Sequence, residues 1–340
     1  MNHEIDLSKF NIRCDLISES IENNYYDKIK VYKKNYGDIR LEKVIVKKDD
    51  EDFLNKKSGI YSTIYFKDVT DVSNRNALIN VLTAELKSIM KKKKLSGSVL
   101  VVGLGNRLST PDSLGPKVTD SIIVTRHLFN LDEVTPSKNV GNVSVFAPGV
   151  YAATGIESVD MLKGVISITK PSFVIVIDAL ASSSIENVNK VVQITDSGVE
   201  PGSGVGNNRK GVSFESLGIP VIAIGIPTVV DAATIVGDTI RFLMKKISYN
   251  IKNIDKASDK LIKGGSASFL NTDYNLDKGE KKKYFGLLGE LSLDETKELF
   301  EEVLTPIGYN FMVTPKEIDF EIEKLSFVIA KSINNVLHNI

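Results

Sequence analysis

The sequence has few of the residues that build common metal sites and nucleophilic active sites. Its 340 residues include one cysteine, Cys14, no tryptophan and three histidines. A single cysteine excludes an internal disulfide framework and a cysteine-rich metal site, and it favours a reducing compartment. His3, His127 and His338 form no His-Glu-x-x-His pair, which excludes a zinc protease of that type. A serine or cysteine nucleophile likewise has no obvious basic partner.

The chain also has no excess charge of either sign and no apolar run long enough to cross a membrane. Lys+Arg and Asp+Glu number 43 each, so no global field favours nucleic acid or an anionic membrane. The lysines at 91–94 end an amphipathic helical pattern, where they face solvent. The first twenty residues contain no apolar core of signal-peptide length. We therefore predict a cytoplasmic protein with no membrane or direct nucleic-acid partner.

The order of apolar patterns predicts an α/β fold. Strand-like runs alternate with helical patterns, which is typical of a mostly parallel central sheet with helices on both faces. We expect strands at 98–103, 143–146, 172–177 and 221–226, and helices at 115–131, 156–169 and 231–246. Residues 41–46 and 61–69 alternate apolar with polar, which predicts a smaller antiparallel element. Residues 252–283 are rich in Lys, Asp, Ser and Gly, which predicts an exposed insertion.

Two aspartates follow two of the apolar runs. Asp112 lies in the loop after the run at 98–102, and Asp178 directly follows the run at 173–177. Because ligands bind beyond the carboxyl ends of parallel strands, the two carboxyls are a candidate catalytic pair. Two carboxylates held close together share a proton, so that one acts as acid and the other as base. On the residues alone, a helix-capping or turn role remains an alternative for each.

The glycines after the first strand indicate a tight turn. Residues 103–106 (GLGN) lack the third glycine of a dinucleotide-binding fingerprint, because Leu108 stands in its place. We expect the turn to leave backbone amides facing a ligand. Gly105, Asn106 and Gly149 are therefore candidates for the oxyanion site or a substrate loop.

Eight blocks of sequence carry a family resemblance that extends over nearly the whole chain. They are residues 103–106 (GLGN), 110–116 (TPDSLGP), 147–150 (APGV), 154–157 (TGIE), 177–182 (IDALAS), 202–207 (GSGVGN), 225–232 (GIPTVVDA) and 313–319 (VTPKEID). In these blocks the sequence resembles the bacterial spore germination proteases, endopeptidases that degrade small acid-soluble spore proteins. The resemblance implies an atypical aspartic peptidase whose two essential aspartates match Asp112 and Asp178.

The same resemblance implies further properties. The substrates would be the DNA-protecting small acid-soluble spore proteins, the assembly a homotetramer, and the location the forespore and spore core. The fold would be related to that of the hydrogenase maturation proteases, which share a Gly-x-Gly-Asn turn after a strand and bind nickel. Their metal-binding histidine has no match here, so we predict neither a metal nor another cofactor.

The resemblance also implies synthesis as a precursor. Residues 1–15 would be a propeptide removed by self-cleavage of the Asp15–Leu16 bond, and residues 16–340 would form a single peptidase domain. Two positions near this bond depart from the family pattern: Cys14 stands where threonine is common, and Ile17 where a small residue is common. These departures concern the processing site and leave the aspartate pair unaffected.

Our leading hypothesis is thus an endopeptidase of spore germination. The alternatives are a binding module that has lost catalysis and a metal-dependent, maturation-type peptidase on the same fold. Cleavage of a spore protein in the presence of a chelator distinguishes the three.

Overall fold

The computed structural model describes residues 15–24, 29–131, 139–200, 210–253, 276–304 and 311–339. These residues form two compact units. The larger contains the described residues of Arg13–Ser182, Glu186–Val229 and Thr314–Ile340. The smaller contains those of Ser183–Ile185 and Val230–Val313.

One mixed sheet organises the larger unit. Its strands are β1 (Val31–Tyr36), β2 (Ile39–Val46), β3 (Gly59–Tyr65), β4 (Val99–Leu104), β5 (Val143–Gly149), β6 (Phe173–Ser182), β7 (Val191–Thr195) and β8 (Val221–Asp231). Their order is β1-β2-β3-β7-β8-β6-β4-β5. The last two residues of β8, Val230 and Asp231, belong to the smaller unit and pair there with the short β9 (Met312–Val313). Strand β4 is parallel to both β5 and β6, whereas β1, β2, β3, β7 and β8 pair antiparallel in succession. The α/β class is confirmed, and the predicted antiparallel element is continuous with the central sheet.

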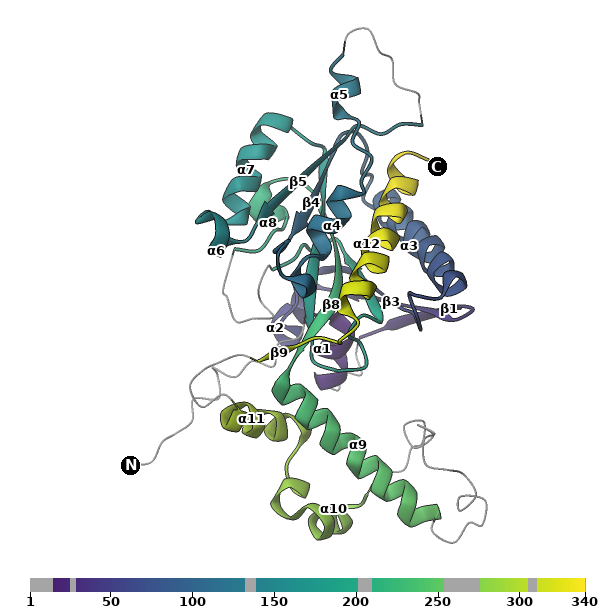
Figure 1. Ribbon diagram of the computed structural model, residues 1–340, viewed down its shortest axis with the longest axis vertical. Coiled ribbons are helices and arrows are strands. Elements are labelled where there is room, and N and C mark those ends of the chain that lie inside the picture. Colours follow the sequence, from purple (N-terminus) through teal and green to yellow (C-terminus); the bar gives the residue numbers. More distant parts are fainter. Residues whose placement is uncertain are drawn as a thin grey trace. The chain divides into compact units, whose positions relative to one another are not determined.

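Apolar side chains cover both faces of the central strands of this sheet, whereas the edge strand β1 is largely exposed. Along β4, Val99 and Val101 belong to one buried cluster, while Leu100 and Val102 belong to another. This alternation follows from the two-residue period of a strand, and it explains why the run is apolar at every position. Helices α3 (Val72–Lys92), α4 (Leu114–Asp120) and α12 (Ile318–Leu337) cover the first face, and α7 (Ser158–Thr169) and α8 (Phe214–Leu217) cover the second (Figure 1). The remaining described helices of this unit are α1 (Ile17–Asn24), η2 (Lys48–Asp50), α2 (Glu51–Leu54), η3 (Thr110–Asp112), α5 (Arg126–Phe129) and α6 (Tyr151–Thr154).

The helix predicted at 115–131 is wrong beyond its first two turns. Helix α4 ends at Asp120, and a separate short helix, α5, begins at Arg126. The residues between them include four β-branched side chains, 122–125, whose restricted rotamers disfavour a helix. Thr125 also pairs with the next strand, because its backbone N–H donates to the Val143 carbonyl at 3.0 Å. This competing backbone pairing ends the helix.

The smaller unit is largely helical. Helix α9 (Ala232–Asn253) packs against α11 (Leu293–Leu304), and α10 (Lys278–Phe285) packs against the short helix η7 (Gly286–Gly289). Helix α9 extends the predicted 231–246 helix by two turns. Of the predicted insertion at 252–283, residues 254–275 lie outside the described residues, and residues 278–283 are helical. Across the described ranges, every helix is too short or too polar to cross a bilayer.

Candidate active site

Asp112 lies in a loop that folds back on the end of β4. The loop leaves the strand at Gly105 and forms the short helix η3, which ends at Asp112. The backbone N–H of Asn106 donates to Asp112 Oδ2 at 2.8 Å, and the Asp112 N–H donates to the Ser109 carbonyl at 2.9 Å. These hydrogen bonds hold the half-buried Asp112 carboxyl beside the carboxyl end of β4.

Gly105 makes this return of the loop possible. Its φ of +113° is a conformation that residues with side chains rarely adopt. A Cβ at this position would lie 2.1 Å from the Asp112 carbonyl oxygen, which is far below van der Waals contact. Glycine is therefore required here both for the turn and for the close approach of Asp112.

Two further contacts fix the Asp112 loop. From β8, the buried Thr228 hydroxyl donates to the Pro111 carbonyl at 2.7 Å. Within the loop itself, Arg107 forms an exposed, bidentate ion pair with Asp120 of α4. The hydrogen bonds from Arg107 lower the pKa of the Asp120 carboxyl below its usual range.

Replacing Arg107 by alanine should have little effect, because both partners of its ion pair are more than half exposed. We expect the free energy of unfolding to fall by less than about 1 kcal/mol, the usual contribution of a surface ion pair. Urea unfolding of the variant measures this change. A loss of several kcal/mol would show that the pair, rather than Gly105 and Thr228, holds the loop.

Asp178 lies inside the neighbouring strand, because β6 continues to Ser182 and does not end at residue 177 as predicted. In the parallel register of β4 and β6, Gly103 is opposite Ile177, so Asp178 follows beside Leu104. Asp178 is 7% exposed, and its Oδ1 accepts a hydrogen bond from the Ala179 N–H at 3.0 Å. Helix η3, which carries Asp112, packs against β6. The structure therefore places Asp178 beside the end of β4, where the Asp112 loop begins.

Gly149 lies at the same end of the sheet. It ends β5 opposite Leu104 and has a φ of +75°. Of the three candidates for the oxyanion or substrate loop, Gly105 and Asn106 thus lie beside Asp112. Gly149 lies on β5, on the opposite side of β4 from β6. The Asn106 N–H donates to the Asp112 carboxylate in this structure.

The predicted processing site is packed against the same sheet. Asp15 pairs with β6: its N–H donates to the Ala181 carbonyl at 3.3 Å, and the Ala181 N–H donates to Asp15 Oδ2 at 2.8 Å. Leu16 is fully buried in a cluster with Leu180 and Val191. Residues 1–14, most of the predicted propeptide, lie outside the described residues. Asp15 and Leu16 are nevertheless held close to the strand that carries Asp178.

The acidic side chain of Glu19 anchors this segment further. Glu19 is 2% exposed, and its Oε1 accepts hydrogen bonds from the Ser182 hydroxyl and the Asn187 side-chain amide. Sequence reasoning did not identify this contact. A polar N-terminal stretch without a sustained period gave no sign that it would be buried.

Gln193 is a second residue that sequence reasoning missed. This β7 residue binds the main chain on both sides of Leu16: its Nε2 donates to the Asp15 carbonyl at 3.1 Å, and its Oε1 accepts from the Ile17 N–H at 2.8 Å. The available signal was that Gln193, the only glutamine of the chain, is a polar residue between two valines and an isoleucine. Nothing in the sequence connected it to a segment 178 residues away.

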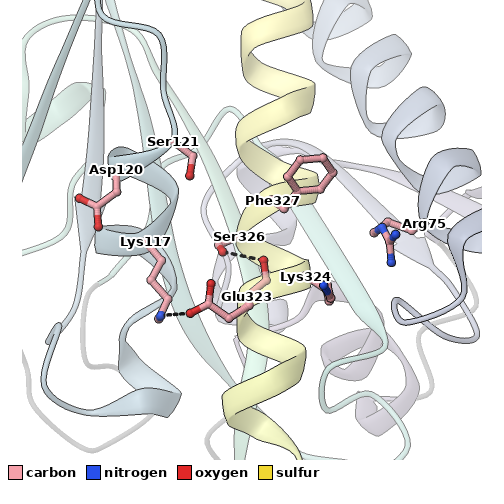
Figure 2. A pocket seen from close by; sticks show the side chains of 8 residues that line it. All are labelled: Arg75, Lys117, Asp120, Ser121, Glu323, Lys324, Ser326 and Phe327. Carbon is pink, nitrogen blue, oxygen red and sulfur yellow. Dashed lines mark hydrogen bonds and ion pairs between the residues drawn. The ribbon is translucent and has the colours of Figure 1, made fainter.

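A surface hollow lies elsewhere on the larger unit. It measures about 460 Å³ and is bordered mostly by polar side chains from α3, from α4 and the residue after it, and from α12, together with Phe327 (Figure 2). Lys117 and Glu323 form an ion pair across it (Figure 2). None of the candidate catalytic or processing residues lines the hollow, so its volume gives no support to the candidate site.

We found no cluster of three or more His, Cys, Asp or Glu side chains suited to a metal ion within the described ranges. Asp112 and Asp178 therefore belong to no such cluster there.

Comparison with known proteins identifies the family. The sequence profile described as germination protease matches residues 13–340. The chain belongs to the germination protease family. Its relatives in that family include the germination protease of Priestia megaterium, which is 41% identical over all of this chain and 97% of its own length. The germination proteases of Bacillus subtilis and Oceanobacillus iheyensis are 40% and 43% identical over 98% and 95% of this chain, and over 95% and 91% of their own lengths.

Membership of the germination protease family makes the chain a protease, which confirms the predicted family and general activity. Among solved structures, a [NiFe] hydrogenase maturation protease, HycI of Thermococcus kodakarensis, aligns with 42% of this chain and 80% of its own. That alignment has 17% identity and a TM-score of 0.27, values too low to support a functional argument.

Proposed function

We propose that this germination protease family member is an endopeptidase that begins the degradation of small acid-soluble, DNA-protecting spore proteins during germination. It acts in the cytoplasm of the forespore and in the spore core, as a homotetramer without a metal. It is made as a precursor and removes residues 1–15 by cutting the Asp15–Leu16 bond. Asp112 and Asp178 are its catalytic pair.

One observation carries the assignment of the pair. The Asp112 loop leaves the carboxyl end of β4 beside Asp178 of the adjacent parallel strand, and this loop is fixed by the Asn106 N–H and the Thr228 hydroxyl. Such strand ends are where α/β folds bind their ligands. A fixed loop also keeps a catalytic group in place without reorganisation during the reaction.

The chemistry of the pair needs only water as a further reactant. The ionised carboxyl takes a proton from a water molecule whose oxygen adds to the carbonyl carbon of the substrate. The carbonyl oxygen becomes an oxyanion, the protonated carboxyl gives its proton to the leaving nitrogen, and the C–N bond breaks. The products are a carboxylic acid and an amine. The pair ends with one proton, as it began.

The packing of Asp15 and Leu16 supports the proposal of a precursor. The bond between them joins an acidic residue tied to β6 to a leucine that is fully buried. The precursor segment thus packs on the face of β6 that carries the Asp178 side chain, because Leu16 contacts Leu180, two residues after Asp178. A spore protein needs access to that surface, so removal of residues 1–15 is expected to open the site.

The test uses the form of the protein that begins at Leu16, incubated with a purified small acid-soluble spore protein with and without EDTA. We expect cleavage at the same rate in both conditions, detected by mass spectrometry of the fragments. Binding without cleavage would contradict an enzyme and favour the binding module. Cleavage that is lost on chelation and restored by added metal would contradict the metal-free pair.

A further inference from the structure

We infer that Gln193 donates the hydrogen bond that stabilises the oxyanion when the chain cuts its own Asp15–Leu16 bond. This inference rests on the proposed function, which assigns that bond as the processing site and Asp112 and Asp178 as the pair. The inference adds Gln193 to the proposed catalytic residues, and neither the sequence motifs nor the family assignment identifies this glutamine.

The contact that carries the inference is made to the carbonyl that would react. Gln193 Nε2 donates to the Asp15 carbonyl oxygen at 3.1 Å, and Gln193 Oε1 accepts from the Ile17 N–H at 2.8 Å. The side-chain amide thus holds the residues on both sides of Leu16 and fixes the direction of the peptide bond between Asp15 and Leu16. Gln193 is 6% exposed, so little water competes for these hydrogen bonds.

The sheet places Gln193 in the same row as Asp178. In the register of β7 and β8, Gln193 is opposite Gly225. The Val174 N–H of β6 donates to the Pro220 carbonyl at 2.9 Å, which sets a parallel register with Val174 opposite Val221 at the start of β8. Continued along both strands, this register places Asp178 beside Gly225. Gln193 and Asp178 are then two strands apart, about 10 Å between their backbones.

The strand alternation puts both side chains on one face. Val191, two residues before Gln193, and Leu180, two residues after Asp178, both contact Leu16 in one buried cluster. Gly225 lies between the two strands and has no side chain to fill the space. The Leu180 side chain reaches over it, since a Cβ on Gly225 would lie 2.4 Å from Leu180 Cδ1. The Asp15–Leu16 peptide is therefore held between β7, through Gln193, and β6, through Ala181, on the face that carries the Asp178 side chain.

This placement suits the charge that develops during cleavage. Water adds its oxygen to the Asp15 carbonyl carbon and gives its proton to the ionised carboxyl of the pair. The carbonyl oxygen then becomes negatively charged while it is bonded to Gln193 Nε2–H. The C–N bond breaks, the proton of the other carboxyl passes to the Leu16 nitrogen, and the Asp15 carbonyl returns as a carboxylic acid. A donor already aimed at this oxygen stabilises the transition state more than the ground state.

The experiment compares the self-processing rate of the full-length precursor carrying Gln193→Met or Gln193→Glu. Methionine keeps the length of the side chain and removes the donor, whereas glutamate keeps the acceptor for the Ile17 N–H. The matched control is Thr63→Val. Thr63 lies directly opposite Gln193 on β3, is 1% exposed, and its hydroxyl has no hydrogen-bond partner in the structure. Released product is identified by the new N-terminus at Leu16, and the thermal unfolding of each precursor shows that it is folded.

We expect both Gln193 variants to process at least about 10²-fold more slowly, the usual effect of removing one oxyanion donor, and Thr63→Val to process at the wild-type rate. The rate of Gln193→Glu relative to wild type should rise as the pH is lowered, because a protonated carboxyl regains an O–H donor. A purely structural role for Gln193 would not produce this recovery. If Gln193→Met fails to fold, Gln193→Glu and its pH dependence decide the question.

The experiment distinguishes a failure of the inference about Gln193 from a failure of the proposed self-processing. If wild-type protein is cut at Asp15–Leu16 and the folded Gln193 variants are cut within about threefold of its rate, the inference about Gln193 is overturned while the proposed function stands. If wild-type protein incubated under germination-like conditions is never cut at Asp15–Leu16, the proposed processing fails and the inference falls with it.

Discussion

Replacing either Asp112 or Asp178 by asparagine is expected to lower the rate of self-processing and of spore-protein cleavage by about 10³-fold. Asparagine keeps the size of the side chain but cannot take up or release the proton, and general acid–base groups usually contribute 10²- to 10⁴-fold. The rate of appearance of the Leu16 N-terminus, measured by mass spectrometry, gives the effect on processing. The same variants made without residues 1–15 give the effect on a spore protein.

The matched control for these variants is Asp120→Asn. Asp120 follows Asp112 by eight residues, but its carboxylate pairs with Arg107 at the surface and is 53% exposed. We expect this variant to cleave at the wild-type rate. Full activity in a folded Asp112→Asn or Asp178→Asn protein would contradict the assignment of the pair.

Replacing Gly105 by alanine is expected to lower both activity and stability. The new Cβ would lie 2.1 Å from the Asp112 carbonyl oxygen, and alanine would have to adopt a φ of +113°. The strain should cost about 1–3 kcal/mol in the free energy of unfolding. The loop relieves the overlap only by moving Asp112, and a displacement of about 1 Å costs about 10²-fold in rate. Urea unfolding and the processing assay measure the two effects separately.

The Gly218→Ala variant separates the effect of backbone strain from the effect of displacing Asp112. Gly218 has a φ of +73°, but a Cβ there would have no neighbour within 4 Å. We expect this control to lose about 1 kcal/mol of stability, the usual cost of a left-handed non-glycine residue, with unchanged activity. If Gly105→Ala behaved in the same way as Gly218→Ala, the close approach to Asp112 would have no bearing on catalysis.

The parts of the fold that follow from local pattern were predictable from the sequence. Continuous apolar runs such as 99–102 and 173–177 are required when both faces of a strand are buried, and both faces of β4 and β6 are covered. The end of β4 places the Asp112 loop at one edge of the sheet, which is why Asp112 was identified. Asp178 was identified from an expected strand end at residue 177, but β6 continues to Ser182, because the strand keeps pairing beyond the end of β4. The end of α4 was not predicted, because the backbone pairing of Thr125 with Val143 depends on a strand that lies 18 residues further on.

The contacts around Asp15 could not be predicted for a similar reason. Gln193 and Glu19 bind partners more than 160 residues away, and a side-chain amide bonded to a backbone carbonyl leaves no repeating signal in the sequence. Family resemblance selects residues that share a motif. It does not select a residue such as Gln193, whose inferred role depends on how the strands align it with Asp178, two strands away.

Under the proposed function, these contacts would connect maturation with the catalytic pair. The segment that contains the predicted processing bond is held by β6, which carries Asp178, and by β7, which carries Gln193. The same sheet surface would therefore position the precursor segment for cleavage and block a spore protein until cleavage is complete. Inactivity of the precursor and its self-processing would then have a common structural basis.

The central claim is that Asp112 and Asp178 act as one unit, and a double-mutant cycle tests it most directly. The measurement is the single-turnover processing rate in EDTA of wild-type precursor, Asp112→Asn, Asp178→Asn and the variant carrying both changes. If the two carboxyls share one proton-transfer task, the double variant should be no slower than the slower single variant, since residues acting as a unit are strongly non-additive. Effects that multiply, so that the double variant is slower by about the product of the two single losses, would contradict the shared pair.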